Sequence, residues 1–267
     1  MNIQLHPNQI SPNFSANPNS PILKFAAKDF YVRIKGYGKN DKWADTVIKT
    51  ADLGSSLIQR GTSPENVLKI ITSGVKKANK TASNISKTET TGILRVNRDN
   101  WIGNVADAFT CFTIDRYKGY AGRLLATRKT PLTSPKPKLA MTRPNKDYPE
   151  LEHGEPLYIN NSLNYVFKIC QKLFNKYVGK EFNEKDLHNI NENIAEIRWV
   201  LAHATPWMRG SDAISNVFMR AIYKSMGIKT YPLAKGVSLD MEAYCTELNQ
   251  YKKNFANYFE KPPIIVD

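Results

Sequence analysis

Residues 196–212 combine the side chains that are most able to do chemistry in this chain. They are Glu196, His203, Arg209, Gly210 and Ser211. The pattern predicts a helix, a short polar loop and a second helix. The first N–H groups of a helix have no partner within it, and the helix dipole makes that end positive. An arginine beside such an end can hold a phosphate through charge-assisted hydrogen bonds, so we predict a phosphate-binding site at Arg209, Gly210 and Ser211.

His203 is the candidate general base of this region, because imidazole titrates near neutral pH. Glu196 lies one to two helical turns earlier, where its carboxylate would hold the tautomer of His203. Both residues also have a structural explanation. His203 can pack, or interact as a partial cation with the end of its helix. Glu196 can hold Arg198, Arg220 or His203 in place.

Ser211 and Asp212 suit the start of the second helix, as N-cap and first-turn acid. Asp212 brings a negative charge to the positive helix end, where it would oppose a bound phosphate. We therefore assign Asp212 and Arg220 to the helix start or to modulation of the site. Arg209 is the residue that local structure explains least.

The elements that must position these residues are helices. Apolar residues at three- and four-residue spacing predict helices over 162–178, 184–204, 212–226 and 239–259. The helix over 184–204 has a core stripe of Leu187, Ile190, Ile194, Ile197 and Leu201. Glu196, Trp199 and His203 lie roughly opposite this stripe. A helix that carries a core stripe on one face and large or polar side chains with possible roles on the other is central in the fold or lines a cleft.

The first half of the chain has weaker signals of secondary structure. Apolar spacing predicts a helix over 41–59, and Ser63-Pro64 suits the start of the next one. A short β-hairpin is predicted over 92–103, with its turn at Asn97 to Asn100. Residues 128–146 carry four prolines, six basic residues and no acid, which predicts a loop or linker.

These patterns predict a mainly α-helical protein with a helical bundle, a small β-hairpin and a disordered N-terminal tail. The predicted parts are a tail over 1–25, a basic helical segment over 26–146, and a bundle over 147–267 that carries the 196–220 site. The tail is a candidate export signal, since its Asn-, Pro- and Ser-rich composition is typical of proteins exported by type III machines.

The charge of the chain is strongly positive and unevenly distributed. The net charge is +14, and residues 31–146 hold 22 Lys and Arg against 8 Asp and Glu. Such a field attracts nucleic acid or an anionic membrane surface, with residues 116–146 as the candidate contact. Solubility alone would also explain it.

Other classes of protein are disfavoured. Cys111, Cys170 and Cys245 are far apart, so we expect reduced thiols and no disulfide framework. The four histidines have no metal-binding spacing, so no metal site is predicted. No apolar run is long enough to span a bilayer, and the N-terminus lacks the pattern of a secretory signal peptide.

The segment Pro206-Trp-Met-Arg-Gly-Ser211 resembles part of the signature of the Fic (Fido) family, His-Pro-Phe-x-x-Gly-Asn-Gly-Arg. The predicted hairpin is similar to the flap of that family. Fic enzymes transfer AMP or another phosphate-bearing group from a nucleotide to a protein hydroxyl. The resemblance implies a Fic-like fold over about 90–230, with Gly210 and Ser211 facing nucleotide phosphates. The chain departs from the signature at Thr205, which replaces the histidine, and at Asp212 and Ala213.

We therefore expect a bacterial effector or toxin-type protein, delivered into a host cell by a non-Sec route. Its 196–220 site would bind a phosphate-bearing ligand and modify a host protein, by nucleotidyl or related transfer. The sequence leaves open whether the protein is an enzyme, and whether a nucleotide is its cofactor. The alternatives are a non-enzymatic basic module that binds nucleic acid or an anionic membrane surface, and an adaptor.

Overall fold

The computed structural model describes residues 41–82, 89–95, 104–105, 151–152, 156–234 and 236–266. This part of the chain is mainly helical, with short strands, which confirms the predicted fold class. The predicted tail, the loop over 128–146 and the boundary at 146 lie outside the described residues. The elements are α2 (Asp41–Gln59), α3 (Pro64–Ala82), β1 (Asn104–Val105), β2 (Leu151–Glu152), α4 (Pro156–Tyr177), α5 (Glu184–Ala204), α6 (Ser211–Ser225), β3 (Ile228–Lys229), α7 (Leu239–Cys245), α8 (Leu248–Asn254), the 3-10 helix η6 (Phe255–Tyr258) and β4 (Ile264–Ile265).

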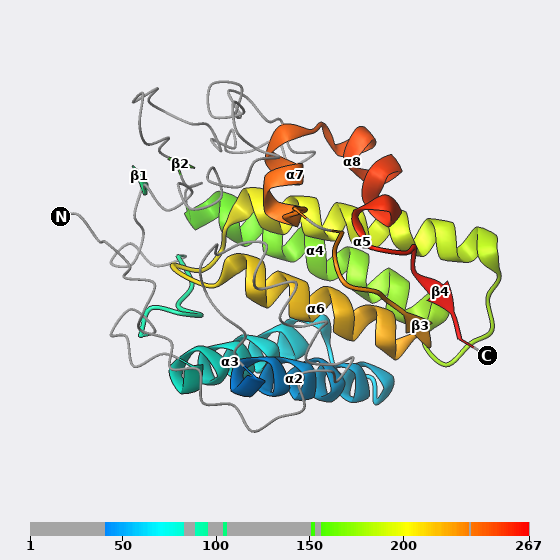
Figure 1. Ribbon diagram of the computed structural model, residues 1–267, viewed down its shortest axis with the longest axis horizontal. Helices are drawn as coiled ribbons and strands as arrows, with labels where there is room; N and C mark the ends of the chain where they lie inside the picture. The colour runs from blue at the N-terminus through cyan, green and yellow to red at the C-terminus, as the bar shows by residue number, and fades with distance from the viewer. Residues whose placement is uncertain are drawn as a thin grey trace.

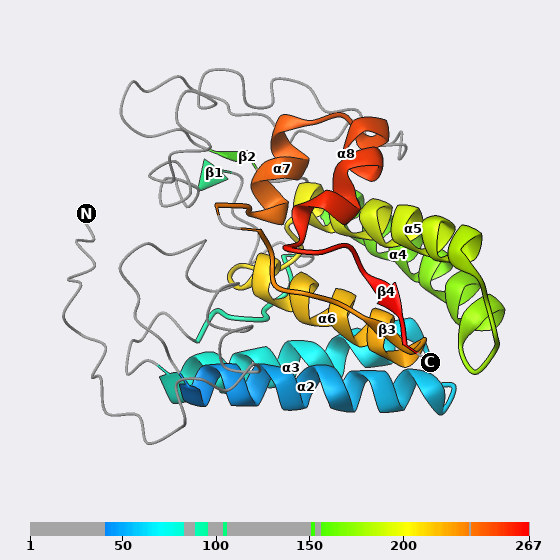
Figure 2. The same cartoon turned by 45° about the vertical axis from the view of Figure 1, so that its right-hand side comes forward.

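The helices pack in layers around α5 and α6. Helices α2 and α3 lie side by side along one side of the molecule, and α6 packs against both (Figures 1 and 2). Helix α5 contacts α4, α6, α7 and α8, and α7 and α8 lie on the side away from α2 and α3 (Figure 2). The strands form two antiparallel pairs, β1 with β2 and β3 with β4. One hydrophobic core runs from Trp43 in α2 to Phe259 after η6.

Helix α5 is the central element, as its two-sided pattern predicts. Ile197 and Leu201 on the core stripe are fully buried, and so are Trp199 and His203 on the other side. The helix is covered on both sides because α6 packs on one flank and the α7–α8 segment on another. In the described residues, no helix is both long and apolar enough to cross a membrane.

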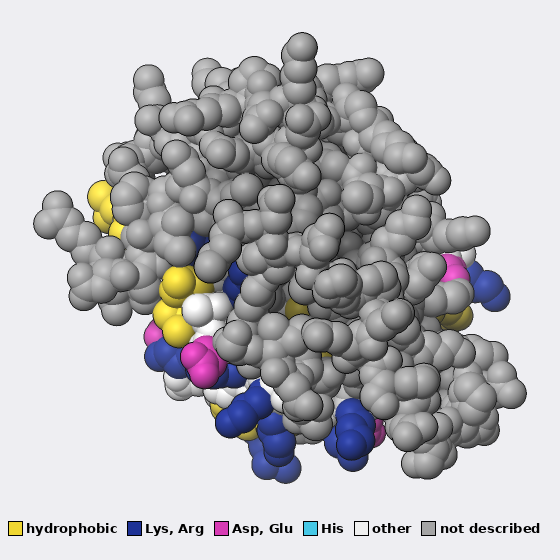
Figure 3. All heavy atoms as spheres, turned by 60° about the vertical axis from the view of Figure 1, so that its left-hand side comes forward, with side chains coloured by type: hydrophobic (Ala, Val, Ile, Leu, Met, Phe, Trp, Pro, Cys, Tyr) yellow, Lys and Arg dark blue, Asp and Glu magenta, His cyan; other side chains and the backbone are white. Residues whose placement is uncertain are grey.

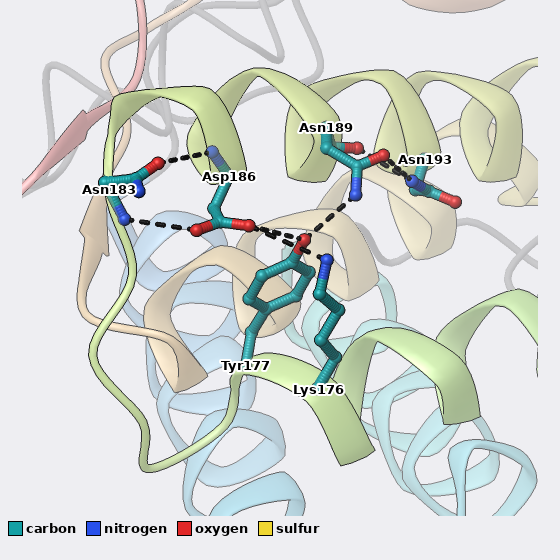
Figure 4. A network of polar contacts seen from close by, with 6 residues as sticks. All are labelled: Lys176, Tyr177, Asn183, Asp186, Asn189 and Asn193. Atoms are coloured by element: carbon teal, nitrogen blue, oxygen red, sulfur yellow. Dashed lines mark hydrogen bonds and ion pairs between the residues drawn. The ribbon is translucent and has the colours of Figure 1, made fainter.

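The turn between α4 and α5 is fixed by polar contacts (Figure 4). Asn183 and Asp186 form a capping box at the start of α5, in which each side chain accepts a hydrogen bond from the backbone N–H of the other. The Tyr177 hydroxyl donates to Asp186 at 3.2 Å and accepts from the Asn189 amide at 2.9 Å. Lys176 adds an ion pair to Asp186 at 3.6 Å. These contacts join the end of α4 to the first turns of α5 and so align the two helices.

The predicted continuous helix over 239–259 is wrong, because the structure divides it into α7, α8 and η6. Thr246 and Glu247 between α7 and α8 have extended backbones. The Thr246 hydroxyl donates to the Glu242 carbonyl, which gives a carbonyl at the end of α7 a partner other than a backbone N–H. After this break Tyr251 and Phe255 pack against each other, with ring centroids 5.5 Å apart. The aromatic residues that suggested one long stripe therefore form a compact cluster.

We predict that Leu201→Ala lowers the free energy of unfolding by about 2–5 kcal/mol, because Leu201 is fully buried in α5. Urea unfolding followed by circular dichroism measures the change. Leu157→Ala on α4 is the control, since Leu157 is 58% exposed and its truncation should cost less than about 0.5 kcal/mol. Equal losses in the two variants would contradict the central position of α5.

Candidate functional site

The loop between α5 and α6 is bounded by two residues with left-handed backbones. Thr205 ends α5 with a φ of 38°, and Gly210 precedes α6 with a φ of 84°. A Cβ atom at Gly210 would lie 3.1 Å from the Thr91 methyl carbon, which is closer than ordinary packing allows. The left-handed backbone at this position favours glycine, and the small space beside Thr91 disfavours a side chain there as well.

Residues 91–95 pair with this loop. Thr91 forms a parallel bridge with Arg209, and Leu94 an antiparallel bridge with Trp207. Three backbone hydrogen bonds hold the pairing: Gly92 N–H to Arg209 O at 3.2 Å, Arg95 N–H to Pro206 O at 2.8 Å, and Met208 N–H to Ile93 O at 2.8 Å. The first arm of the predicted hairpin is therefore paired with the 206–209 loop, and residues 96–103 lie outside the described residues.

The side chain of Arg95 strengthens the same contact. Arg95 is buried, with 2% of its surface exposed. Its Nε donates to the Trp207 carbonyl at 3.2 Å, and its Nη2 donates to the Met208 carbonyl at 2.9 Å. A charged donor gives a stronger hydrogen bond than a neutral one. Residues 91–95 thus fix the conformation of the loop from one side.

A buried ionic cluster lies behind the start of α6. Arg198 of α5 is fully buried, and its Nη2 donates to Asp212 at 3.1 Å and to Asp240 at 3.0 Å. The Asn216 amide donates to the second oxygen of Asp212 at 3.2 Å. Asp212 is in the first turn of α6, and Asp240 is in the first turn of α7. One guanidinium therefore ties the starts of two helices to the middle of α5.

The predicted hydrogen bond between Glu196 and His203 is not present. Glu196 accepts a hydrogen bond from the Tyr165 hydroxyl and pairs with Lys252 at 3.2 Å. Burial, the hydrogen bond to Glu196 and the charge of Glu196 raise the pKa of Tyr165 to about 12. Glu196 therefore joins α4 and α8 to α5.

The His203 ring lies against Trp199, with centroids 3.8 Å apart, and it is fully buried. Its Nδ1 is 2.8 Å from the Trp199 carbonyl oxygen. A carbonyl oxygen only accepts hydrogen bonds, so this contact favours the tautomer with the proton on Nδ1. The Trp199 carbonyl therefore orients the His203 ring, a role that the sequence analysis gave to the Glu196 carboxylate.

The remaining predicted residues lie at or near the loop. Gly210 is the N-cap of α6, so the prediction of Ser211 as N-cap is wrong by one residue. The Ser211 hydroxyl donates back to the Trp207 carbonyl at 3.2 Å and closes the loop. Arg209 is half-buried beside it. Arg220 contacts Thr230 and Tyr231 after β3, and its role in modulating the site stays a prediction.

Sequence reasoning missed Arg95 and Asp240 as residues of the site, and it named Arg198 only as a possible partner of Glu196. A signal for Arg198 was present, because it is the one cation within the stretch Ile194 to Ala202, where the helix is otherwise mostly apolar. A charge in the middle of a buried helix requires partners of opposite charge. Among the described residues, no cluster of His, Cys, Asp or Glu could hold a metal ion.

Residues 131–262 match the AvrB_AvrC family, described as avirulence protein. The matched segment contains α4 to η6 and therefore the whole loop and the Arg198 cluster. It makes up just under half of the chain. The match indicates a bacterial avirulence effector, which is consistent with delivery into a host cell and with a host target. No curated protein matches the chain.

This match overturns the resemblance to the Fic family that was drawn from residues 206–211. The positions that depart from the Fic signature have structural roles in this fold. Thr205, at the position of the signature histidine, ends α5 with a left-handed backbone. Asp212, at the second glycine, is paired with buried Arg198. A short run of similar residues around a helix start was too little to define a family.

We predict that Arg198→Met lowers the free energy of unfolding by about 3–5 kcal/mol, because it leaves the carboxylates of Asp212 and Asp240 buried beside an apolar side chain. Urea unfolding at neutral pH measures the loss. Adding Asp212→Asn and Asp240→Asn should restore part of it, since the uncompensated charges are then removed. Arg60→Met on exposed residue 60 is the control. A loss below about 1 kcal/mol for Arg198→Met would contradict the central role of the cluster.

Proposed function

We propose that this avirulence-class effector acts on a host protein through a site for a phosphate-bearing ligand, formed by the 206–210 loop and the first turn of α6. In this proposal Arg209 supplies the charged contact. The first N–H groups of α6, at Ser211 and the residues after it, supply the backbone donors. Such a site would bind a nucleotide, a sugar nucleotide or another phosphate-bearing group.

One observation carries the proposal: the loop is held in a single conformation from two sides. Residues 91–95 bind its backbone on one side. The Arg198–Asp212 ion pair holds the start of α6 on the other side. A binding loop that is already ordered loses little conformational entropy when its ligand arrives, so more of the interaction energy appears as affinity.

The charge of Asp212 does not oppose this ligand as strongly as the sequence suggested. Its carboxylate is buried, one oxygen accepts from Arg198, and the other accepts from Asn216. The positive charge of Arg198, at 3.1 Å from Asp212 and 3.0 Å from Asp240, offsets part of the negative charge at the helix start. In the proposed site the positive end of the helix dipole would add to the charge of Arg209.

Several parts of the function stay predictions. A catalytic role for His203 and Glu196 is one, and so is chemical transfer to a host protein. Delivery by a non-Sec route is another. The alternative contact with nucleic acid through residues 116–146 lies outside the described residues. The binding site proposed here requires none of them.

We predict that Arg209→Ala weakens the binding of a phosphate-bearing ligand about 10- to 100-fold, as expected for the loss of one or two charge-assisted hydrogen bonds. Isothermal titration of the full chain with ATP, GTP, CTP, UTP and sugar nucleotides measures the affinity. The fold should be unaffected, because Arg209 is half-buried on the loop.

Arg60→Ala is the matched control, since it removes one exposed arginine from the far end of α2. It should leave the affinity unchanged. If no ligand in the panel binds the wild-type protein, or if both variants weaken binding equally, a phosphate site at Arg209 is wrong.

A further inference from the structure

Strands β3 and β4 form a short ribbon whose outward face carries exposed apolar side chains. The register pairs Lys229 with Ile264, and the Val266 N–H donates to the Gly227 carbonyl at 3.1 Å. Side chains alternate between the two faces of a strand, so Ile264 and Val266 lie on one face and Ile265 on the other, where it packs against the core. Ile264 and Val266 are 42% and 53% exposed, although few large apolar side chains are exposed in the described ranges.

A hollow beside this face leaves room for the side chains of a partner. Its volume is about 540 Å³, and it is lined by Gly227 just before β3, by Met226 and by the turn over 178–181 between α4 and α5. A Cβ atom at Gly227 would meet no atom within 4 Å apart from its chain neighbours, so the space beside Val266 is open. The outward face of the ribbon therefore continues into a depression.

Two lysines converge at the other end of the ribbon. The ammonium groups of Lys229 and Lys261 lie 5.4 and 5.7 Å from the centre of the Tyr231 ring. Both lysines are exposed, and neither is within ion-pair distance of a carboxylate in the part of the chain that the structure describes. Arg220 donates to the Thr230 hydroxyl at 3.2 Å and so holds the segment that carries the ring. Like charges that are gathered at one ring repel each other, and an anionic partner would relieve this repulsion.

We propose that this face of the ribbon docks an extended, acidic segment of a host protein. Charge complementarity determines the kind of partner, because its carboxylates would pair with Lys229 and Lys261 while its apolar side chains cover Ile264 and Val266. The match to an avirulence family supports a host protein as the source of the segment. The ribbon follows the end of α6, about 22 Å from the start of this 15-residue helix, so the proposal does not rest on the phosphate site.

The charge pattern favours a discrete peptide over an extended anionic surface. Glu181, which lines the hollow, and Glu260, beside Lys261, are both exposed. A layer of lipid headgroups or a nucleic-acid backbone would meet these carboxylates together with the lysines. A short segment can place its own carboxylates beside the lysines alone. The two exposed aliphatic side chains also have no counterpart in a phosphate backbone, whose contacts are electrostatic.

The test is fluorescence anisotropy of the full-length protein with a labelled peptide, Glu-Ser-Glu-Ser-Val-Ser-Val. Alternate residues of an extended chain face the same side, so its glutamates and valines form one face. We expect binding at low salt, and weaker binding when Gln replaces the glutamates or Ser replaces the valines. Lys229→Gln with Lys261→Gln should weaken binding about 5- to 30-fold, as for the loss of two exposed ion pairs.

Ile264→Thr with Val266→Thr tests the apolar part of the same face. It should weaken binding about 3- to 10-fold, since it removes apolar contact area. Threonine keeps the β-branched shape that suits a strand, and the replaced side chains are largely exposed, so the variant should melt at the wild-type temperature.

Lys76→Gln with Lys80→Gln is the matched control, because both lysines are exposed in the last turns of α3. Helix α3 ends on the side of the molecule away from β3 and β4 (Figures 1 and 2). Figure 3 turns that side forward and shows that Lys and Arg side chains project there as well. The control therefore removes the same charge from another basic surface, and it should bind the peptide as the wild type does.

Four results would overturn the proposal. The first is absence of peptide binding at low salt. The second is equal weakening by the control, which would mean that net charge alone attracts the peptide. The third is binding that does not change when the valines of the peptide, or Ile264 and Val266, are replaced. The fourth is binding of anionic vesicles or of an oligonucleotide through Lys229 and Lys261, without binding of the peptide.

Discussion

The buried guanidinium of Arg198 is the constraint on which the arrangement of α5, α6 and α7 depends. Transfer of a charge from water into a protein interior costs several kcal/mol, and this cost is offset only by well-placed partners. Arg198 has two such partners, Asp212 and Asp240, each about 3 Å from the same nitrogen. Neither α6 nor α7 can shift along α5 without separating one of these carboxylates from Arg198. The cluster therefore selects one packing among several that apolar contacts alone would tolerate.

The same cluster decides the geometry of the proposed site. The 206–209 loop follows directly from α5 and leads into α6, and its two flanking residues, Thr205 and Gly210, both have positive φ. Loops of this kind are usually mobile, since they have few contacts. This one has backbone partners in residues 91–95 and a buried ion pair behind it. The position of Arg209 is thus set by contacts that are far apart in the sequence.

Features that are determined by neighbouring residues, such as most helix bounds, were predicted from the sequence. Contacts between residues far apart in the chain were missed. The bounds of α5 were predicted correctly, because its apolar spacing is a local signal. The bounds of α6 were wrong by one residue, because Gly210, with its left-handed backbone, is the N-cap in place of Ser211. The pairing of Arg198 with Asp240 has no local signal, since the two residues lie on different helices. The break after α7 was hidden because the aromatic residues of α8 and η6 continue the spacing of α7.

The α2–α3 pair is connected to the loop of the proposed phosphate site through one side chain. The Asn79 amide accepts from Trp43 and donates to the Thr91 hydroxyl, at 2.8 and 3.3 Å. Thr91 in turn forms the bridge to Arg209. The α2–α3 pair is therefore joined to the loop of the proposed phosphate site by a short series of direct contacts, so the loop cannot move without disturbing the packing of these two helices.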